Sequence, residues 1–167
     1  MDLIDCLLTE TGFEQRRQRL VTRYELDNVA TDRPLPAEIS EQLGTRDSVL
    51  TTRIRQFDTA SVGITLSGPS YRDNPILYAT ETFRDFTGYP LRELQGRNPR
   101  LLQGPDTEAD AVNTLHEAID IWERATVELW NYRRDGTRFR TRITVVPVPD
   151  SNGVINNWLG LQTTLEQ

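Results

Sequence analysis

The chain has 167 residues, of which 37% are hydrophobic and 26% are charged, and its net charge is −6 at pH 7. This length suits one well-packed domain with an appendage and is short for two full domains. The acidic balance disfavours binding to a nucleic-acid backbone, and no apolar run approaches the roughly 20 residues that span a bilayer. We therefore expect a soluble protein that contacts neither a membrane nor nucleic acid.

Cysteine and histidine are nearly absent, which limits the chemistry open to the chain. Cys6 is the single cysteine and His116 the single histidine, so neither a disulfide framework nor a set of Cys and His metal ligands can form. The first five residues carry acidic groups where a secretory signal carries basic ones. We expect a cytoplasmic protein without a metal centre.

Residues 1–60 are predicted to form a helical extension that serves coupling or dimerisation. Apolar residues recur at helical spacing over 37–57, which predicts one amphipathic helix there. A second helix is predicted to open at Thr11, where the sequence fits a capping box, and to run through Tyr24. The pattern changes near Ser61, where the second segment begins.

Residues 61–167 are predicted to form an α+β domain. The predicted strands cover residues 62–66, 76–79, 125–134, 137–146 and 154–164. Short helices that end at glycines fill the interval 80–106, and a longer helix begins at Thr107. Asp135 and Gly136 predict a tight hairpin between the third and fourth strands, because glycine readily adopts a positive φ. The sheet is therefore expected to be largely antiparallel.

Side-chain parity along the last three strands brings polar groups to the inward face of the sheet. Asn131, Thr141 and Gln162 share their inward faces with apolar residues. A buried amide without a partner costs about 1–3 kcal/mol, so each of these groups requires a partner. That partner is either a polar ligand, such as a planar heterocycle, or the three groups themselves and a buried water. Parity alone leaves both alternatives open.

The run from Gly96 to Thr107, Gly-Arg-Asn-Pro-Arg-Leu-Leu-Gln-Gly-Pro-Asp-Thr, resembles the signature of light-oxygen-voltage (LOV) domains, the flavin-binding branch of the PAS superfamily. Family-like runs flank it in the right order, at residues 73–78, 86–89, 127–136 and 160–162. The resemblance covers about residues 61–165. It implies the PAS fold, a five-stranded antiparallel sheet with short helices that enclose a cofactor pocket.

The resemblance implies FMN as the cofactor, ahead of riboflavin or FAD. By this similarity the ring and ribityl chain would bond to Asn98, Gln103, Asn131 and Gln162, the phosphate would pair with Arg100, and Asn74 and Ser67 would line the site. These roles suit the chemistry, because amides match the carbonyl and imide groups of isoalloxazine and a guanidinium pairs well with phosphate.

Three positions depart from the family pattern. Pro99 stands where the family has the cysteine that attacks the flavin, so no adduct can form there, although Asn98 can cap the short helix in which proline takes the first position. Thr141 stands where the family usually has an asparagine at the ring, and His116 aligns with an arginine that often binds the phosphate. Cys6 is expected to be a small buried hydrophobic residue rather than a replacement nucleophile.

We expect a sensor rather than an enzyme, since no nucleotide-binding glycine loop, catalytic triad or substrate site is evident. Without a thiol, blue light or cellular redox state would drive one electron and one proton onto the flavin, giving the neutral semiquinone, and Gln162 would reorient its amide. Candidate electron donors are Trp130, Tyr132 and Trp158. The alternative is a flavin-free PAS domain that serves only protein–protein interaction.

The outward face of the predicted sheet is partly apolar and partly basic. It carries Trp130, Leu159, Leu161, Arg138, Arg140 and Arg142. A surface of this kind is usually covered, so we expect the 37–57 helix, a second copy of the chain, or both to cover it. The expected partners are therefore a second copy, bound through the sheet face or the N-terminal helices, and an output protein of unknown identity.

Overall fold

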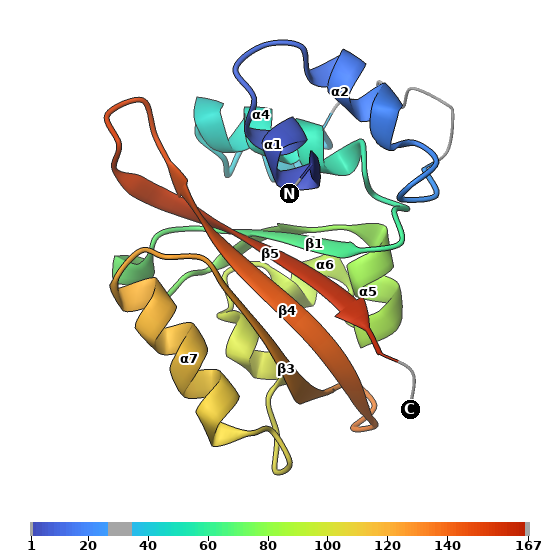
Figure 1. The fold of residues 1–167 in the computed structure, drawn as a ribbon, viewed down its shortest axis with the longest axis vertical. Helices are drawn as coiled ribbons and strands as arrows, with labels where there is room; N and C mark the ends of the chain where they lie inside the picture. Colours follow the sequence, from blue (N-terminus) through green and yellow to red (C-terminus); the bar gives the residue numbers. More distant parts are fainter. Residues whose placement is uncertain (1, 27–34, 166–167) are drawn as a thin grey trace. The chain divides into compact units, whose positions relative to one another are not determined.

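The computed structural model of the chain describes residues 2–26 and 35–165 (Figure 1). Its contacts divide the chain into two compact units, Met1–Ser61 and Val62–Gln167. Within the described residues the first unit is helical, and the second contains the strands.

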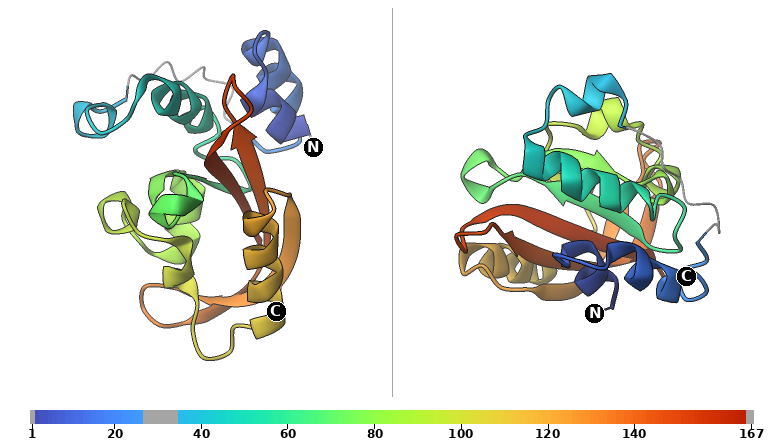
Figure 2. Two further views of the ribbon diagram at one scale, coloured as in Figure 1. Left: turned by 90° about the vertical axis from the view of Figure 1, so that its left-hand side faces the viewer. Right: turned by 90° about the horizontal axis from the view of Figure 1, so that it is seen from above.

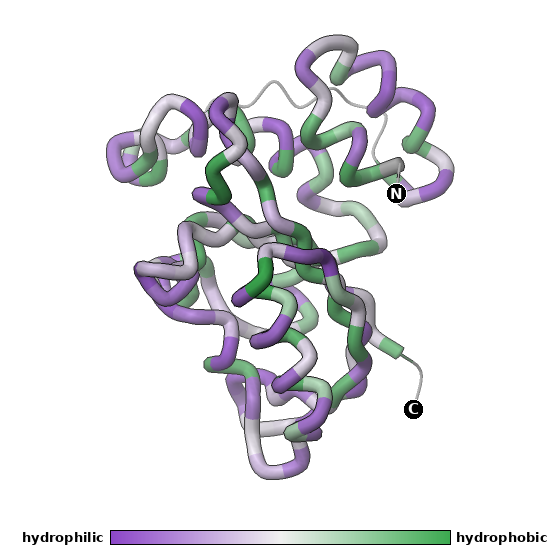
Figure 3. The backbone as a smooth tube through the Cα atoms, turned by 60° about the vertical axis from the view of Figure 1, so that its left-hand side comes forward, coloured by the Kyte–Doolittle hydropathy of each residue, from purple (hydrophilic) through white to green (hydrophobic). Residues whose placement is uncertain are grey.

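Four helices make up the described part of the first unit. They are α1 (Asp2–Leu8), α2 (Phe13–Leu20), α3 (Ala37–Ser40) and α4 (Thr45–Arg55). The rings of Phe13 and Phe57 meet edge to face with their centroids 6.3 Å apart. Arg53 donates to the carbonyl oxygens of Leu7 (2.9 Å) and Thr9 (2.5 Å), which ties α4 to the end of α1. Most of α2 is hydrophilic in Figure 3, and its buried residues are Arg17 and Leu20.

These helices differ from the prediction. The helix predicted over 37–57 is divided into α3 and α4, because Gly44 is extended, with ψ 169°, and begins α4 as its N-cap. The capping box predicted at Thr11 does not form: the N-cap of α2 is Gly12, whose φ of 74° is left-handed, and no side chain bonds there. α2 also ends before Tyr24, and α1 has no counterpart in the prediction.

The second unit is built on one five-stranded sheet. Its strands are β1 (Gly63–Ser67), β2 (Ile76–Ala79), β3 (Ala125–Tyr132), β4 (Arg138–Pro149) and β5 (Ile155–Thr164). They lie in the order β2-β1-β5-β4-β3, and every neighbouring pair is antiparallel. The predicted fold class, a five-stranded antiparallel sheet with short helices, is confirmed.

Helical segments of this unit connect β1 to β2 and β2 to β3. They are η1 (Ser70–Arg72), α5 (Glu81–Thr87), α6 (Leu91–Leu94), η2 (Pro99–Leu102) and α7 (Ala109–Asp120). The four segments that follow β2 gather on one side of the sheet (Figure 2). A core cluster of Ile76, Ala79, Phe83, Leu94 and Leu102 joins α5, α6 and η2 to β2. This packing anchors η2 through Leu102, whereas α7 packs against β3.

The hairpin between β3 and β4 turns at Asp135 and Gly136 as predicted. Gly136 has φ 86°, and the N–H of Arg133 donates to the carbonyl of Thr137 at 2.8 Å. The Asp135 carboxylate accepts from the hydroxyl (2.6 Å) and the N–H (2.9 Å) of Thr137, and these bonds lower its pKa. The turn therefore sets the β3–β4 register, which decides which side chains face inward.

Two absences can be stated for residues 2–26 and 35–165. No helix there is long and apolar enough to cross a membrane. No group of three or more carboxylate, cysteine or histidine side chains in the same ranges is placed to hold a metal ion.

Candidate cofactor pocket

A cavity of about 350 Å³ lies within the second unit, lined by the inward face of the sheet and by η1, η2 and α7. This volume falls within the range of pockets that take small ligands. Nine of the ten residues predicted for the site line it: Ser67, Asn74, Asn98, Pro99, Arg100, Gln103, His116, Asn131 and Gln162. The structure thus brings together side chains from six separate segments. Thr141 is the predicted residue that does not line the cavity.

The sheet supplies two buried amides to the cavity. Asn131 on β3 is 2% exposed and Gln162 on β5 is 4% exposed. Gly160 precedes Gln162 on the same face and also lines the cavity, so the floor is flat at that point. Leu129 and Ile143 complete the floor as apolar neighbours. A lining that combines apolar side chains with two buried amides suits a planar ring that carries polar groups.

The structure bears on both alternatives that parity left open. The Thr141 hydroxyl lies 3.5 Å from Oε1 of Gln162, so those two side chains contact each other. Asn131 has no such partner, because no residue in the described ranges bonds to its side-chain amide. A buried amide at a cavity wall calls for a polar ligand or water there. This observation supports the fit of a flavin ring edge to the site.

Thr141 takes a different place from the one predicted. It is 0% exposed, and its hydroxyl donates to the carbonyl of Thr163 at 3.0 Å. A threonine side chain is short, so a hydroxyl turned to the neighbouring strand does not reach the cavity. Thr141 therefore contacts the side chain of Gln162 but does not line the pocket.

The segment η2 presents its residues as predicted. Asn98 is the N-cap of η2, and its Oδ1 accepts from the N–H of Arg100 at 2.9 Å. Pro99 occupies the first helical position, where a missing N–H costs nothing. The proline is accommodated without breaking the segment, and it offers no nucleophilic atom to the cavity.

An acidic residue at the cavity was not predicted. Asp73, which follows η1 with a left-handed φ of 66°, lines the cavity and pairs with Arg100 through both carboxylate oxygens. Asn98 donates to its carbonyl oxygen at 2.8 Å. Asp73 directly precedes Asn74 in the run 73–78, which the resemblance covers. The carboxylate in that run is the sequence feature that could have indicated an acidic residue at the cavity. Asp120 at the end of α7 is a second unpredicted carboxylate on the lining.

Helix α7 forms an apolar wall with a polar rim. Val112, Leu115 and Ile119 line the cavity from successive turns. His116 lies on the same lining and is exposed, so it stands at the mouth. Of the three candidate electron donors, Trp130, Tyr132 and Trp158, it is Trp158 that lines the cavity. Its side chain is 4% exposed, and its Nε1 has no hydrogen-bond partner among the described residues.

Cys6 is not placed to act as a nucleophile. Its side chain is 0% exposed in the first unit, where the thiol contacts the carbonyl of Phe13 at 3.8 Å. Burial raises its pKa to about 11, against the partial opposition of Arg53 and neighbouring arginines. The thiol therefore stays protonated at neutral pH, and the expectation of a small buried hydrophobic residue is confirmed.

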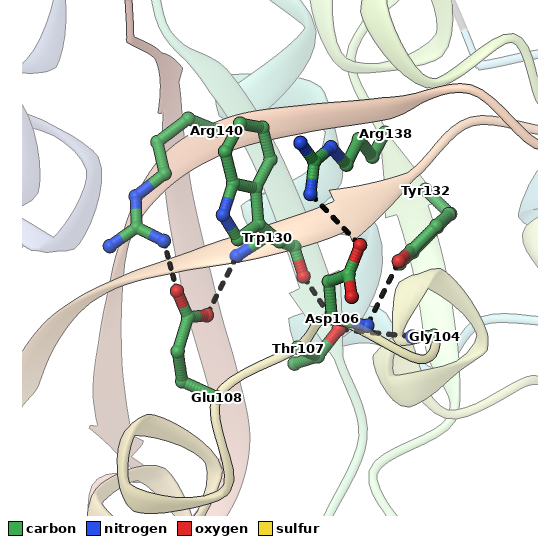
Figure 4. Close-up of polar contacts among 8 residues, drawn as sticks. All are labelled: Gly104, Asp106, Thr107, Glu108, Trp130, Tyr132, Arg138 and Arg140. Carbon is green, nitrogen blue, oxygen red and sulfur yellow. Dashed lines mark hydrogen bonds and ion pairs between the residues drawn. The ribbon is translucent and has the colours of Figure 1, made fainter.

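The loop between η2 and α7 clasps the edge strand β3 (Figure 4). Thr107 donates to the carbonyl of Trp130 at 2.6 Å, and the N–H of Trp130 donates to Glu108 at 2.9 Å. Both backbone groups of this edge residue are thus satisfied by side chains. Gly104 allows the close approach, because a Cβ there would lie 2.4 Å from the ring of Tyr132. The clasp fixes the loop that begins at Gln103.

The same loop reaches the outward face of the sheet. Arg140 pairs with Glu108, and Arg138 pairs with Asp106 at 2.8 Å (Figure 4). The guanidinium carbons of Arg138 and Arg140 lie 4.3 and 5.6 Å from the centroid of the Trp130 ring. Trp130 therefore points away from the cavity, as its parity predicted.

The five-stranded antiparallel sheet with short helices around a cavity defines an α+β domain of the PAS type, and comparison with known families agrees. The profile of the PAS domain matches residues 61–163, which is more than half of the chain. The chain belongs to the PAS domain family. Its solved structural neighbours are LOV domains, as the motif from Gly96 to Thr107 predicted.

Three similar proteins illustrate the relationship. A bacterioopsin transcriptional activator of Halobacterium salinarum is 37% identical over 111 residues, 66% of this chain and 16% of that protein. A blue-light-activated histidine kinase of Brucella anthropi is 35% identical over 115 residues, 65% of this chain and 23% of that protein. A structure described as a flavin-analogue study of a light-oxygen-voltage domain mechanism has a TM-score of 0.64 and 38% identity, covering 68% of this chain and 84% of that one.

The match therefore concerns one module of longer proteins. The chain spans about a sixth and a quarter of the lengths of the two curated relatives. The matched module in this chain is the sensor module, whereas the kinase named in one relative is a property of that whole protein.

Proposed function

We propose that residues 62–165 form a flavin-binding blue-light or redox sensor that acts without a cysteine adduct. The observation that carries this proposal is the buried Asn131 amide on the lining of a cavity of about 350 Å³, which Gln162 and Pro99 also line. Relatives named as blue-light receptors and LOV domains support a flavin-binding light sensor. A flavin supplies visible absorption and one-electron chemistry that no side chain offers.

The chain's own residues would hold the ring by two kinds of contact. Asn131 and Gln162 would bond to the polar edge, while Leu129 and Ile143 below and Leu115 on α7 would pack against the ring faces. Burial of both amides excludes competing water, which strengthens each bond. FMN is the form that the resemblance implies.

The proposed photochemistry follows from the absence of a thiol. Pro99 has no nucleophile and Cys6 is a buried thiol, so light would transfer one electron and one proton to the flavin, giving the neutral semiquinone in place of an adduct. Trp158 is the proposed electron donor because it lines the cavity, and the proton would come from solvent. An external thiol or other reductant would then return one electron to the oxidised indole. The side-chain amide of Gln162 would reorient when the flavin gains this proton.

An absorption experiment tests the proposal. The purified protein, reconstituted with flavin, is illuminated with blue light without oxygen and with a reductant present. We expect structured flavin absorption in the dark and a long-wavelength radical band after illumination, and Trp158→Phe should slow its appearance. Cys6→Ala is the matched control and should change nothing. A flavin-loaded protein that bleaches to an adduct-like spectrum, or that shows no radical, contradicts the adduct-free mechanism.

The alternative, a flavin-free PAS interaction domain, has a distinct outcome. A colourless protein that cannot be reconstituted with any flavin would support it. The buried Asn131 amide and the cavity favour the flavin-binding hypothesis. A domain that binds no ligand would be more stable if apolar side chains filled this space and replaced the amide.

The proposed output is a change in association with a second copy or an output protein, in the cytoplasm, passed through the N-terminal helices or the sheet face. Val49 on α4 is 50% exposed, so Val49→Arg alters a surface without touching a core. Ile54 is 0% exposed and would confound the test by unfolding the helix. We expect the light-dependent change in molecular mass by light scattering to be lost in Val49→Arg while flavin absorption stays. A mass change equal to that of the native protein excludes this surface.

A further inference from the structure

The ionisable groups on the cavity lining are unfavourable for a phosphate. Among the described residues they are one guanidinium, Arg100, two carboxylates, Asp73 and Asp120, and the imidazole of His116. With histidine counted as neutral, the formal charge of the lining is negative. A phosphate monoester carries about −1.5 to −2 at neutral pH, so it would enter a site that already holds excess negative charge.

The single guanidinium is already engaged. Arg100 donates from Nη1 to Oδ1 of Asp73 at 2.8 Å and from Nη2 to Oδ2, which is the bidentate arrangement that a phosphate would also use. The Arg100 hydrogen bonds hold the pKa of Asp73 below its usual range, and Asp73 raises that of Arg100. Both groups are therefore charged at neutral pH.

The carboxylate is also held in position by its own loop. The N–H of Asp73 donates to the carbonyl of Ser70 at 2.9 Å, and the N–H of Asn74 donates to the carbonyl of Pro69 at 3.1 Å. Asn98 contributes bonds to both the backbone and the side chain of Asp73. A phosphate that took Arg100 would leave this carboxylate beside it, without its cation.

We propose that Asp73 removes the selectivity of this pocket for the phosphate of FMN, so that riboflavin binds at least as tightly as FMN. The inference rests on the proposed function, because it assumes that the cavity takes a flavin ring. The ring contacts at Asn131 and Gln162 are the same for both ligands, so they do not discriminate. Selectivity is decided at the mouth, where one guanidinium serves two anions.

Flavin titrations test the inference without illumination. Apo-protein is titrated with riboflavin and with FMN, and flavin fluorescence quenching gives the two dissociation constants. For the native chain we expect a Kd for FMN equal to or above that for riboflavin. In Asp73→Asn, which keeps the side-chain shape and tolerates a left-handed φ, we expect FMN to bind about 10-fold more tightly and riboflavin to change less than about 3-fold.

Two further variants make the test specific. Asp106→Asn is the matched control, because Asp106 also pairs with an arginine on this unit but does not line the cavity, and it should leave both constants unchanged. Asp73→Asn combined with Arg100→Gln should lose the gain in FMN affinity, since the released guanidinium is what the phosphate would use.

The outcomes separate the inference from the proposed function. Native protein that binds FMN about 10-fold or more tightly than riboflavin overturns the inference and leaves the proposed function intact. An FMN affinity that does not rise in Asp73→Asn likewise overturns it. Binding of neither flavin overturns both. Equal or riboflavin-favoured binding, shifted toward FMN by Asp73→Asn alone, establishes the role of Asp73.

Discussion

The hydroxyl of Thr141 lies 3.0 Å from the carbonyl of Thr163 and 3.5 Å from Oε1 of Gln162. A hydroxyl has one proton, so it cannot donate fully to both oxygens, and the shorter distance favours Thr163. If the Gln162 amide turns, its Nε2 can donate to the same hydroxyl while the hydroxyl donates to Thr163. Thr141 is therefore suited to stabilise the reoriented amide.

Replacing Thr141 tests this relationship. Thr141→Val keeps the shape and removes the hydroxyl, so we expect the free energy of unfolding to fall by about 1 kcal/mol and the photoproduct to decay faster. Thr141→Ser keeps the hydroxyl and should retain the native photoproduct lifetime. Urea unfolding and spectroscopic decay in the dark measure the two quantities. A Val variant with an unchanged lifetime would show that Gln162 does not depend on this contact.

Asn131 offers a prediction in which stability and binding move in opposite directions. Asn131→Leu replaces an unpartnered buried amide by an apolar group of similar size, so the ligand-free protein should gain about 1 kcal/mol of stability. Flavin binding should weaken about 10-fold or more, because one ring bond is lost and the polar edge meets a methyl group. Thermal unfolding and flavin titration measure the pair. A variant that loses stability yet keeps its affinity contradicts the assigned role.

Gly104 is predicted to be intolerant of any side chain. A Cβ would lie 2.4 Å from the Tyr132 ring, so Gly104→Ala should cost about 1–3 kcal/mol as the clasp on β3 is forced open. Gly44→Ala is the control, because a Cβ at Gly44 meets nothing within 4 Å. Adding Tyr132→Ala should recover part of the loss from Gly104→Ala. Denaturant unfolding of these three variants and of the native protein decides whether contact with Tyr132 is the cause.

Glu108 predicts a pH dependence of stability. Burial alone would raise its pKa, but the bonds from the Trp130 N–H and from Arg140 outweigh burial and hold it below the ordinary value of 4.5. A depressed folded-state pKa means that the stabilisation is present above that ordinary value and is lost as pH falls through the folded-state value. Glu108→Gln should therefore be less stable than the native protein at pH 7.

The difference between those two proteins should shrink as the pH falls below 4.5, which thermal unfolding at several pH values would follow. Asp135 is the matched control. The pKa of Asp135 is also lowered, but by hydrogen bonds from Thr137 within the same turn. Asp135→Asn therefore removes a local contact and leaves the contact between the loop and β3 intact. Curves for Glu108→Gln that stay parallel to the native curve at every pH would rule out a contribution from its ionised carboxylate.

Local patterns were sufficient for much of the fold. The hairpin at Asp135 and Gly136, the cap at Asn98 and the inward parity of Asn131 each depend on a few neighbouring residues, and each appears as predicted. Helix boundaries in the first unit were less predictable. Apolar spacing over 37–57 is consistent with one helix or two, and an extended Gly44 costs little, so packing could divide the helix there.

The cavity shows the same division. Alternation along β3 puts Asn131 on the same face as Leu129, and alternation along β5 puts Gln162 on the same face as Gly160, because successive side chains point to opposite sides of a sheet. The pairing of both strands with β4 then brings these two faces to the same side of the sheet. Thr141 also has inward parity, yet its hydroxyl donates to the carbonyl of Thr163 on the neighbouring strand. The rotamer of a side chain depends on such contacts with neighbouring strands, which the local sequence does not specify.

Contacts between distant segments were decided only when the chain folded. Asp73 and Arg100 are 27 residues apart, and Glu108 and Arg140 are 32 apart, so no local pattern pairs them. Their meeting depends on where the whole fold places η1, η2 and the loop that follows η2, of which η2 is anchored in the core cluster by Leu102. The amino-acid sequence determined a sheet with polar groups on its inward face, and tertiary packing determined which charges meet at the mouth of the cavity, because side-chain pairing over such separations follows from the positions of whole elements.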